Sequence, residues 1–259
     1  MMLISSSRVR RATFVGLVTA VAAACGTKEA PGPLEPSGAV GRVRFVNLIT
    51  DPARGTVNAI LEGVPFGVNL AYTQTTPASL AAPSTAPYAS ILTGSRTLVL
   101  KRTADTNVTV ATIGFTITDG QDRTVYATGG AGGGAVSAVV TTDSNPAAAA
   151  TQARVRLVNL SPAAGTVDAF LTAAGADLAA ATPTATSVPN GGASAYLAVA
   201  PGTYTLRLVP AGTAPASRAA AVSVTLTGIA LAGGTGRTIV VADRSTGGAP
   251  AQAFVLTDR

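Results

Sequence analysis

The sequence has no histidine and no tryptophan, and its 259 residues include a single cysteine, Cys25. Without histidine, neither a Ser-His-Asp nor a Cys-His nucleophilic arrangement can form. One cysteine and no histidine also leave out the usual ligand sets for zinc and haem. We therefore expect no cofactor, no metal site and no catalytic residue of these common kinds.

Aromatic and charged residues are scarce, at 4 % and 12 % of the chain. The formal net charge of +6 falls to +3 if Arg8, Arg10 and Arg11 are removed with the leader described below. The remaining basic residues are scattered, and none of their clusters is longer than Lys101-Arg102. Because nucleic-acid-binding proteins concentrate positive charge on one face, we predict no nucleic-acid partner.

Residues 1–24 have the layout of a secretory signal peptide. A basic segment precedes an apolar stretch at residues 12–24, which is too short to span a bilayer comfortably. Small residues then lead to Cys25, which cannot form an intramolecular disulfide because it has no partner. Two interpretations stay open. Either a plain signal peptide is followed by a cysteine that is there by chance, or Cys25 itself has a function in the mature protein.

The segment from Val21 to Gly26 resembles the lipobox of bacterial lipoproteins, with Ala22 where leucine is commoner. In that family the cysteine is acylated and becomes the first residue of the mature protein. The resemblance implies an exported chain held on a membrane by acyl chains on Cys25, and Gly26 is similar to the signal for the outer membrane. Residues 25–41 are rich in proline, glycine and charge, which predicts a disordered tether after the lipidated cysteine.

One segment of the chain occurs twice. Arg-Val-Arg-Phe-Val-Asn-Leu at residues 42–48 returns as Arg-Val-Arg-Leu-Val-Asn-Leu at residues 154–160. The similarity runs on to the closing segments, at residues 139–143 and 254–258. A repeat of this length predicts two copies of one domain rather than a solenoid of short units. We place the copies at residues 42–143 and 154–259, with a linker at 144–153.

Each copy has the pattern of a β-sandwich. Tyr204, Leu206 and Leu208 alternate with polar neighbours, as in a half-buried strand. Strands are expected at residues 42–48, 56–62, 66–72, 88–92, 96–102, 109–118, 123–128 and 136–142, and at 154–160, 166–172, 194–199, 203–209, 219–227, 236–242 and 251–257. This number and spacing predict an all-β protein of two tandem immunoglobulin-like antiparallel sandwiches.

The repeated segments resemble the bacterial domain of unknown function 4397. The second copy carries the resemblance in Ser161-Pro162, Val167-Asp168 and Pro201-Gly202-Thr203-Tyr204, whereas Asn58 replaces the aspartate in the first copy. Both copies have asparagine where the family often has histidine. The resemblance implies an exported, sandwich-like, surface-associated module, and it brings no established catalytic residue.

Four polar residues recur at the first strand of each copy. Asn47 and Asn159 precede a loop, where a short amide can bond neighbouring backbone and fix the loop, or bind a ligand. Arg44 and Arg156 alternate with apolar residues, which predicts a solvated sheet face, although a recurring arginine could also face a partner.

Among the acids, only Asp143 and Asp258 recur at one position, and we expect them to be solvated strand ends. Asp119-Gly120-Gln121-Asp122 has oxygen ligands for calcium but lacks the further acids of a calcium loop, which favours a polar turn. The glycine-rich run at residues 129–134 lacks the Lys-Ser/Thr of a phosphate-binding loop and is interpreted as a connection between strands.

Three functions remain open. The first, which we favour, is a lipid-anchored cell-envelope protein whose two non-catalytic modules bind an envelope polysaccharide or protein, or act as a spacer. The second is an accessory subunit of a periplasmic or outer-membrane assembly. The third is a carboxylate-based hydrolase of unrecognised type. The sequence names neither the ligand nor the oligomeric state.

Overall fold

The computed structural model describes residues 38–77, 87–143 and 147–258. The predicted signal peptide, the lipidation site Cys25 and most of the tether lie outside these residues. The first strand begins at Val40, so the last two residues assigned to the tether belong to the sandwich. Within the described ranges, no helix is long and apolar enough to cross a membrane.

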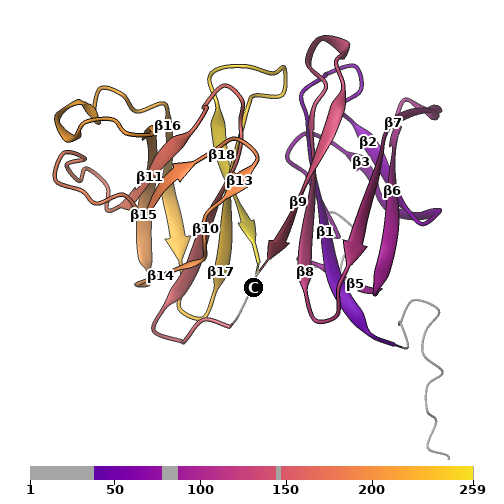
Figure 1. The fold of residues 1–259 in the computed structure, drawn as a ribbon, viewed down its shortest axis with the longest axis horizontal. Helices are drawn as coiled ribbons and strands as arrows, with labels where there is room; N and C mark the ends of the chain where they lie inside the picture. The colour runs from indigo at the N-terminus through magenta and orange to yellow at the C-terminus, as the bar shows by residue number, and fades with distance from the viewer. Residues whose placement is uncertain (1–37, 78–86, 144–146, 259) are drawn as a thin grey trace, which may run out of the picture. The chain divides into compact units, whose positions relative to one another are not determined.

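Within residues 38–77 and 87–143, the first repeat has nine strands in two sheets (Figure 1). One sheet has the order β4-β1-β8-β9, with β5 also paired to β1, and the other has the order β3-β2-β6-β7. The strands are β1 (Val40–Ile49), β2 (Val57–Leu61), β3 (Val64–Leu70), β4 (Thr75–Thr76), β5 (Ala89–Leu92), β6 (Gly94–Arg102), β7 (Asp105–Ile117), β8 (Asp122–Gly129) and β9 (Val136–Asp143).

The second repeat has the same topology, strand for strand. Its sheets have the orders β13-β10-β17-β18, with β14 on β10, and β12-β11-β15-β16. The strands are β10 (Ala153–Leu160), β11 (Val167–Thr172), β12 (Ala185–Val188), β13 (Gly192–Ala193), β14 (Leu197–Val199), β15 (Gly202–Pro210), β16 (Val224–Leu231), β17 (Gly236–Ala242) and β18 (Gln252–Thr257). The all-β fold class and the two sandwiches are confirmed.

One strand pair in each repeat departs from the antiparallel pattern. β1 runs parallel to β8, and β10 runs parallel to β17, in matching registers. The chain leaves β1 for the other sheet and returns to this sheet later, which is the crossover that parallel neighbours require. The sheet that contains the repeated Arg-Val-Arg segment is therefore mixed.

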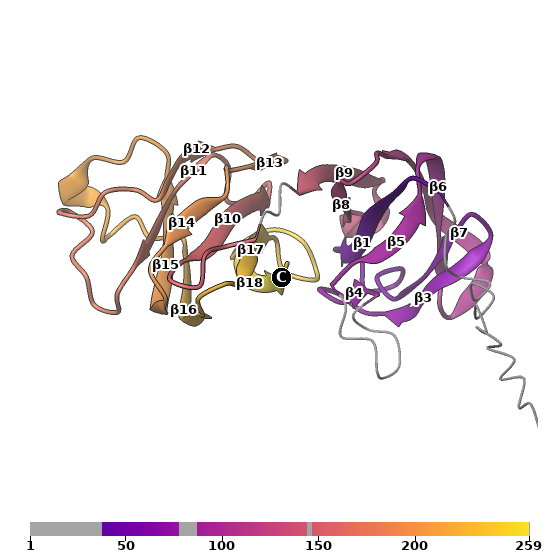
Figure 2. The same ribbon diagram turned by 90° about the horizontal axis from the view of Figure 1, so that it is seen from below.

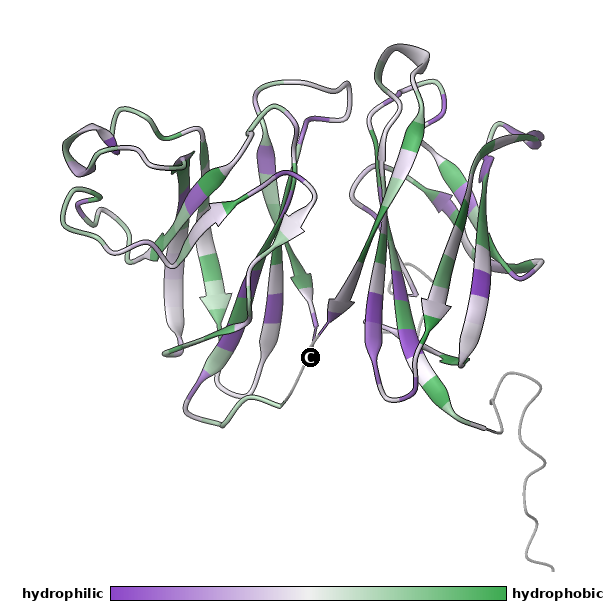
Figure 3. Cartoon of the chain, in the orientation of Figure 1, coloured by the Kyte–Doolittle hydropathy of each residue, from purple (hydrophilic) through white to green (hydrophobic). Residues whose placement is uncertain are grey.

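Each sandwich has its own apolar core between its two sheets, which form separate layers in Figure 2. Val43 and Phe45 of β1 enter the first core, and Val155 and Leu157 of β10 enter the second. Apolar and polar residues alternate along many strands (Figure 3), because successive side chains point to opposite faces of a sheet.

The repeats differ on the outer face of the sheet that contains β2 or β11. In the second repeat, Phe170 packs with Leu178 and Val209 in a small cluster supplied partly by long connections at residues 173–184 and 211–223. In the first repeat the corresponding connections are only two residues long, at 62–63 and 103–104. The longer second connection also moves β16 to Val224–Leu231, five residues later than the strand predicted from residue 219.

The short strands β4, β12 and β13 were not predicted. β4 and β13 have only two residues each, and β12 reads Ala-Thr-Ser-Val, which offers little apolar signal. Of the linker, residues 147–152 are described and form a turn against the second repeat. The nitrogen of Gly234 donates to the carbonyls of Ala149 and Gln152, so this part of the linker is fixed to that repeat.

Candidate functional site

Arg44 and Arg156 are buried, with 1 % and 3 % of their surface exposed. The prediction of a solvated sheet face is therefore wrong. Residues Glu35–Arg259 form one compact unit, and within it the outer face of the β1-β8-β9 layer packs on the outer face of the β10-β17-β18 layer. Both faces of each of these sheets are thus buried, and the two arginines lie where the repeats meet.

The centre of this contact is apolar, and we call it the interrepeat cluster. Its buried members are Val46, Leu48, Tyr126, Val158, Leu160, Val240, Ala242 and Leu256. Val46 and Leu48 share a face of β1 with Arg44, as Val158 and Leu160 share a face of β10 with Arg156, because strand residues two apart point the same way.

The arginines form ion pairs that cross between the repeats. Arg44 Nη2 donates to Asp258 Oδ1 at 3.0 Å, and Arg156 Nη2 donates to Asp143 Oδ1. Each arginine also donates to a backbone carbonyl of the other repeat, at Thr257 (2.8 Å) and Thr142 (3.3 Å). Each repeat thus contributes one arginine that binds the aspartate of the other repeat, and one aspartate that the arginine of the other repeat binds. This reciprocity is that of a two-fold symmetric interface. We call these contacts the crossed ion pairs.

Asp143 and Asp258 are 3 % and 2 % exposed, so they are not the solvated strand ends that the sequence predicts. Each carboxylate accepts a tyrosine hydroxyl, from Tyr88 (2.7 Å) and Tyr196 (2.9 Å) respectively. Each also accepts a threonine hydroxyl of its own repeat, from Thr124 and Thr238. Several charge-assisted hydrogen bonds therefore satisfy each buried carboxylate.

Each arginine also makes a cation–π contact with the tyrosine of its own repeat. The guanidinium of Arg44 lies 4.5 Å from the ring centre of Tyr88, and that of Arg156 lies 4.8 Å from that of Tyr196. Burial raises the pKa of the Tyr88 and Tyr196 hydroxyls, and the nearby carboxylates add to the rise. Burial lowers the pKa of both arginines, but the neighbouring tyrosines and carboxylates outweigh it, so the pKa of each arginine is raised.

Tyr126 interrupts the symmetry of the contact, because its counterpart in the second repeat is Val240. Its side chain is fully buried in the interrepeat cluster, and its hydroxyl has no hydrogen-bond partner among the described residues. Burial raises the pKa of this hydroxyl to about 12. The hydroxyl is an isolated polar group in an apolar contact, which is a cost to stability.

Asn47 and Asn159 make the backbone contacts that the loop-fixing interpretation requires. Asn47 Nδ2 donates to the carbonyls of Gly55 (2.5 Å) and Leu70 (2.8 Å), and its Oδ1 accepts from the nitrogen of Ile49 (3.1 Å). Asn159 repeats the pattern with Gly165, Val188 and Ser161, at distances of 2.7, 3.1 and 3.2 Å. Both amides are fully buried, so they join the loop after the first strand to the neighbouring sheet.

Asn58 and Asp168 are a second pair of equivalent polar residues, to which the sequence assigned no structural role. Asn58 Oδ1 accepts from the nitrogen of Asn69 (2.9 Å), and Asp168 Oδ1 accepts from the nitrogen of Ser187 (2.8 Å). Asn69 and Ser187 both have positive φ, of 53° and 50°, where the edge strands β3 and β12 are irregular. Asn58 and Asp168 therefore have the same structural role, because either side chain supplies the oxygen that accepts the hydrogen bond from the edge strand.

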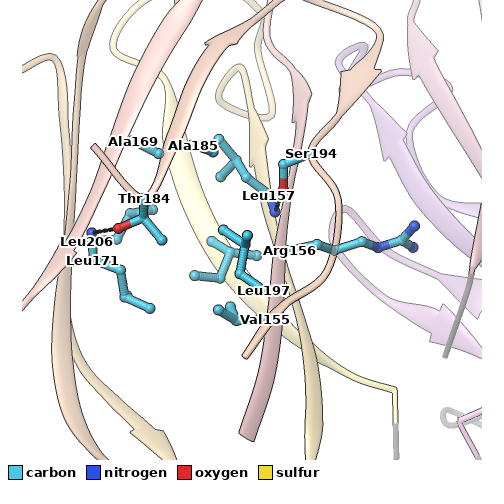
Figure 4. A pocket seen from close by; sticks show the side chains of 11 residues that line it. Val155, Arg156, Leu157, Ala169, Leu171, Thr184, Ala185, Ser194, Leu197 and Leu206 are labelled. Carbon is cyan, nitrogen blue, oxygen red and sulfur yellow. Dashed lines mark hydrogen bonds between the residues drawn. The ribbon is translucent and has the colours of Figure 1, made fainter. Parts of the chain in front are cut away.

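Three hollows among the described residues lie in the second repeat or beside it. The smallest, about 20 Å³, is apolar and lies among Val155, Leu157 and Leu206, with the guanidinium of Arg156 turned away from it (Figure 4). Two open hollows, of about 250 and 420 Å³, share a wall at residues 193–195. The larger one is lined by Thr142, Arg154, Arg156, Ala193, Ser194, Ala195 and Tyr196.

The remaining candidates have structural contacts. Asp122 forms a bidentate pair with Arg42, at 2.7 and 2.6 Å, beside the turn that holds Asp119. The glycine-rich run is the connection from β8 to β9, and the carbonyls of Gly130 and Gly134 accept from Arg54. In the described part of the chain, His, Cys, Asp and Glu residues form no group of three that could hold a metal ion.

A sequence model described as a domain of unknown function (DUF4397) matches residues 41–170. This segment covers half of the chain: the first sandwich from its second residue onward, then β10 and most of β11 of the second. The chain belongs to the DUF4397 family. DUF4397 membership and the all-β fold fit a non-catalytic β-sandwich module.

Other comparisons add little to the DUF4397 match. No curated protein matches the chain. Among solved structures, a leucine-rich repeat protein from Bacteroides thetaiotaomicron is similar to 80 % of the chain, with 11 % identity and a TM-score of 0.17. The chain spans 26 % of the length of that structure. A likeness this weak carries no argument about fold or function.

Proposed function

We propose that this protein is a lipid-anchored cell-envelope protein whose two repeats present one rigid, non-catalytic surface to an envelope polymer or protein. The observation that carries the proposal is the pair of crossed ion pairs. They engage Asp143 and Asp258, the only acids that recur in both repeats, in buried contacts. The recurrent carboxylates hold the repeats together, and so they are not exposed to a substrate.

The contact between the repeats sets how such a surface would bind. Two modules on a flexible linker gain avidity only when both can engage together. Here the outer faces of the sheets β1-β8-β9 and β10-β17-β18 pack on each other and are not available to a partner. A partner would therefore contact the loops, the edge strands or the other two sheets. Sandwich loops and edge strands are well suited to binding through backbone and hydroxyl groups.

The binding part of the proposal is tested with residues 35–259, the compact unit that holds both repeats. We expect this unit to sediment with isolated envelope polysaccharide or with peptidoglycan, and to leave the polymer chain length unchanged on prolonged incubation. A hydrolytic activity that is lost when one carboxylate is replaced would overturn the proposal. Failure to bind any envelope fraction would leave only the spacer role.

The anchoring part concerns Cys25 and is tested on the full chain. We expect labelled palmitate to enter the protein in cells and to be absent from the Cys25→Ser variant. A matched Ser7→Ala variant, altered in the leader away from the cysteine, should keep the label. Label that persists in Cys25→Ser would contradict lipidation at this residue.

A further inference from the structure

Equivalent arginines in the two repeats have different surroundings. Arg42 begins the repeated segment of the first repeat, and its Nε and Nη2 both donate to the carboxylate of Asp122. Arg154 holds the same position in the second repeat, where the residue opposite it on the parallel strand is Gly236 rather than an aspartate. The second repeat therefore keeps the arginine and lacks the carboxylate that pairs with it.

The side chain of Arg154 forms no hydrogen bond or ion pair within the described ranges. It is half-buried and lines the open hollow of about 420 Å³ at the junction of the repeats. The hollow has a volume in the range of about 300–1,000 Å³ that is usual for ligand sites. Among the described residues, no acidic side chain lines it. Arg156, which also lines the hollow, is buried and already has Asp143 as its partner.

We propose that Arg154 binds the carboxylate of an acidic sugar in this hollow, in the place that Asp122 occupies beside Arg42. The planar guanidinium favours two parallel hydrogen bonds to a carboxylate, as the first repeat demonstrates within its own chain. This inference rests on the proposed function and names the chemical class of the envelope polymer: a polysaccharide that contains uronic acid residues.

The lining favours a sugar over an acidic peptide. Ser194 and Thr142, which carry hydroxyl groups, line the same hollow as Arg154, and Tyr196 adds an aromatic ring. The neighbouring hollow of about 250 Å³ continues the site past residues 193–195 and adds Thr184, Thr186 and Ser187. A run of hydroxyl side chains suits a ligand with many hydroxyl groups, and two adjoining hollows suit a chain of sugar rings.

Binding by residues 35–259 is measured by calorimetry with galacturonic acid oligomers, neutral galactose oligomers of equal length and a glutamate-rich peptide. We expect the galacturonic oligomer to bind best and its affinity to fall as salt is added. Arg154→Gln should lower this affinity by about ten- to a hundredfold, the usual effect of losing hydrogen bonds between charged groups.

Two further variants make the test specific. Gly236→Asp places a carboxylate opposite Arg154, as Asp122 stands opposite Arg42 in the first repeat. This carboxylate should pair with Arg154 and compete with the ligand, so the affinity should fall as it does in Arg154→Gln. Arg42→Gln alters the equivalent arginine that already has a partner, so it should leave the affinity within about twofold.

Equal affinity for neutral and acidic oligomers, or an affinity that neither Arg154→Gln nor Gly236→Asp changes, would overturn this proposal while leaving a neutral envelope polymer as the ligand of the proposed function. Tighter binding of the glutamate-rich peptide would overturn it in favour of a protein partner. Failure to bind any envelope fraction would instead contradict the proposed binding function as a whole.

Discussion

At the scale of single residues, the crossed ion pairs determine what each repeat can tolerate. Breaking a buried pair leaves an uncompensated charge and costs roughly 3–5 kcal/mol. We expect Arg156→Met to destabilise the protein by an amount in this range, measured by urea denaturation. Asp143→Asn should also destabilise it, and the double variant should lose less than the sum of the two because the charges act on each other.

The Arg102–Asp105 pair is the matched control, because its side chains are 33 % and 41 % exposed. Arg102→Gln should change the free energy of unfolding by less than about 1 kcal/mol, since exposed pairs contribute little. Additive effects of Arg156→Met and Asp143→Asn would contradict a direct interaction between the two residues.

Tyr126 gives the opposite expectation at the same contact. Its hydroxyl is buried without a partner, so Tyr126→Phe should leave stability unchanged or raise it by about 1 kcal/mol. Tyr88→Phe removes a hydroxyl that donates to Asp143, and it should destabilise the protein by about 1.5–3 kcal/mol. The comparison by thermal denaturation separates a hydroxyl that is bonded from one that is not, and a larger loss for Tyr126→Phe would contradict this account.

At the scale of strands and loops, the buried amides join the end of the first strand to the loop that follows it. We expect Asn47→Ala and Asn159→Ala each to destabilise the protein by about 1–3 kcal/mol, because each leaves buried backbone groups without a partner. Hydrogen exchange should become faster at Ile49 in Asn47→Ala and at Ser161 in Asn159→Ala, since those nitrogens donate to the amides.

Asn107 is exposed near the start of strand β7, so Asn107→Ala serves as the control for these substitutions and should change little. Faster exchange throughout the sandwich, rather than at the loop, would indicate that the amides support the whole core instead.

The strands were largely predictable from sequence because period-two alternation and turn residues report local structure directly. The burial of Arg44 was not predicted, because alternation shows which residues share a face and not what covers that face. A signal was nevertheless present: Val46 and Leu48 lie on the same face as Arg44, so the face is mostly apolar. Strands buried on both faces have nearly continuous apolar runs, and Val-Tyr-Ala at 125–127 and Ile-Val-Val-Ala at 239–242 fit that pattern.

The parallel pairing of β1 with β8, and the contact of Arg44 with Asp258, could not be predicted in the same way. Both join residues far apart in sequence, and neither leaves a local pattern. The recurrence of Arg44 and Asp143 as Arg156 and Asp258 is visible in the sequence, but it does not show that these residues contact one another. Only the structure shows that each arginine pairs with the aspartate of the other repeat.

At the scale of the whole molecule, the buried tyrosines link the repeat contact to pH. The pKa values of Tyr88, Tyr126 and Tyr196 are all raised in the folded protein. A tyrosine whose pKa is raised on folding favours the folded state only while it stays protonated. Its contribution to the free energy of unfolding is therefore complete below the unfolded-state pKa of about 10 and is lost as the pH rises above 10. Each such tyrosine should add a loss of about 1.4 kcal/mol per pH unit above pH 10.

Urea denaturation at pH 8, 9, 10 and 11 measures this dependence. The midpoint should be nearly constant up to pH 9 and should fall between pH 10 and 11. Tyr126→Phe should show a shallower fall, because one of the tyrosines whose pKa is raised in the folded protein is gone. An equal slope in that variant would contradict the contribution of Tyr126.

The repeats should behave as one unit even when the chain between them is cut. A protease site inserted between Asn145 and Pro146 allows cleavage of the folded protein. Separation would expose the interrepeat cluster and would remove from Arg44 and Arg156 the aspartate that each binds in the other repeat. Exposing apolar surface and buried charge together is unfavourable, so we expect the two fragments to elute as one species and to unfold in a single transition.

Cleaved protein carrying Asp143→Asn and Asp258→Asn should separate more readily, because both crossed ion pairs are lost while the apolar cluster stays intact. Fragments of the unsubstituted protein that elute apart and keep their fold would show that each sandwich is stable alone, and the crossed ion pairs would then serve only to align them.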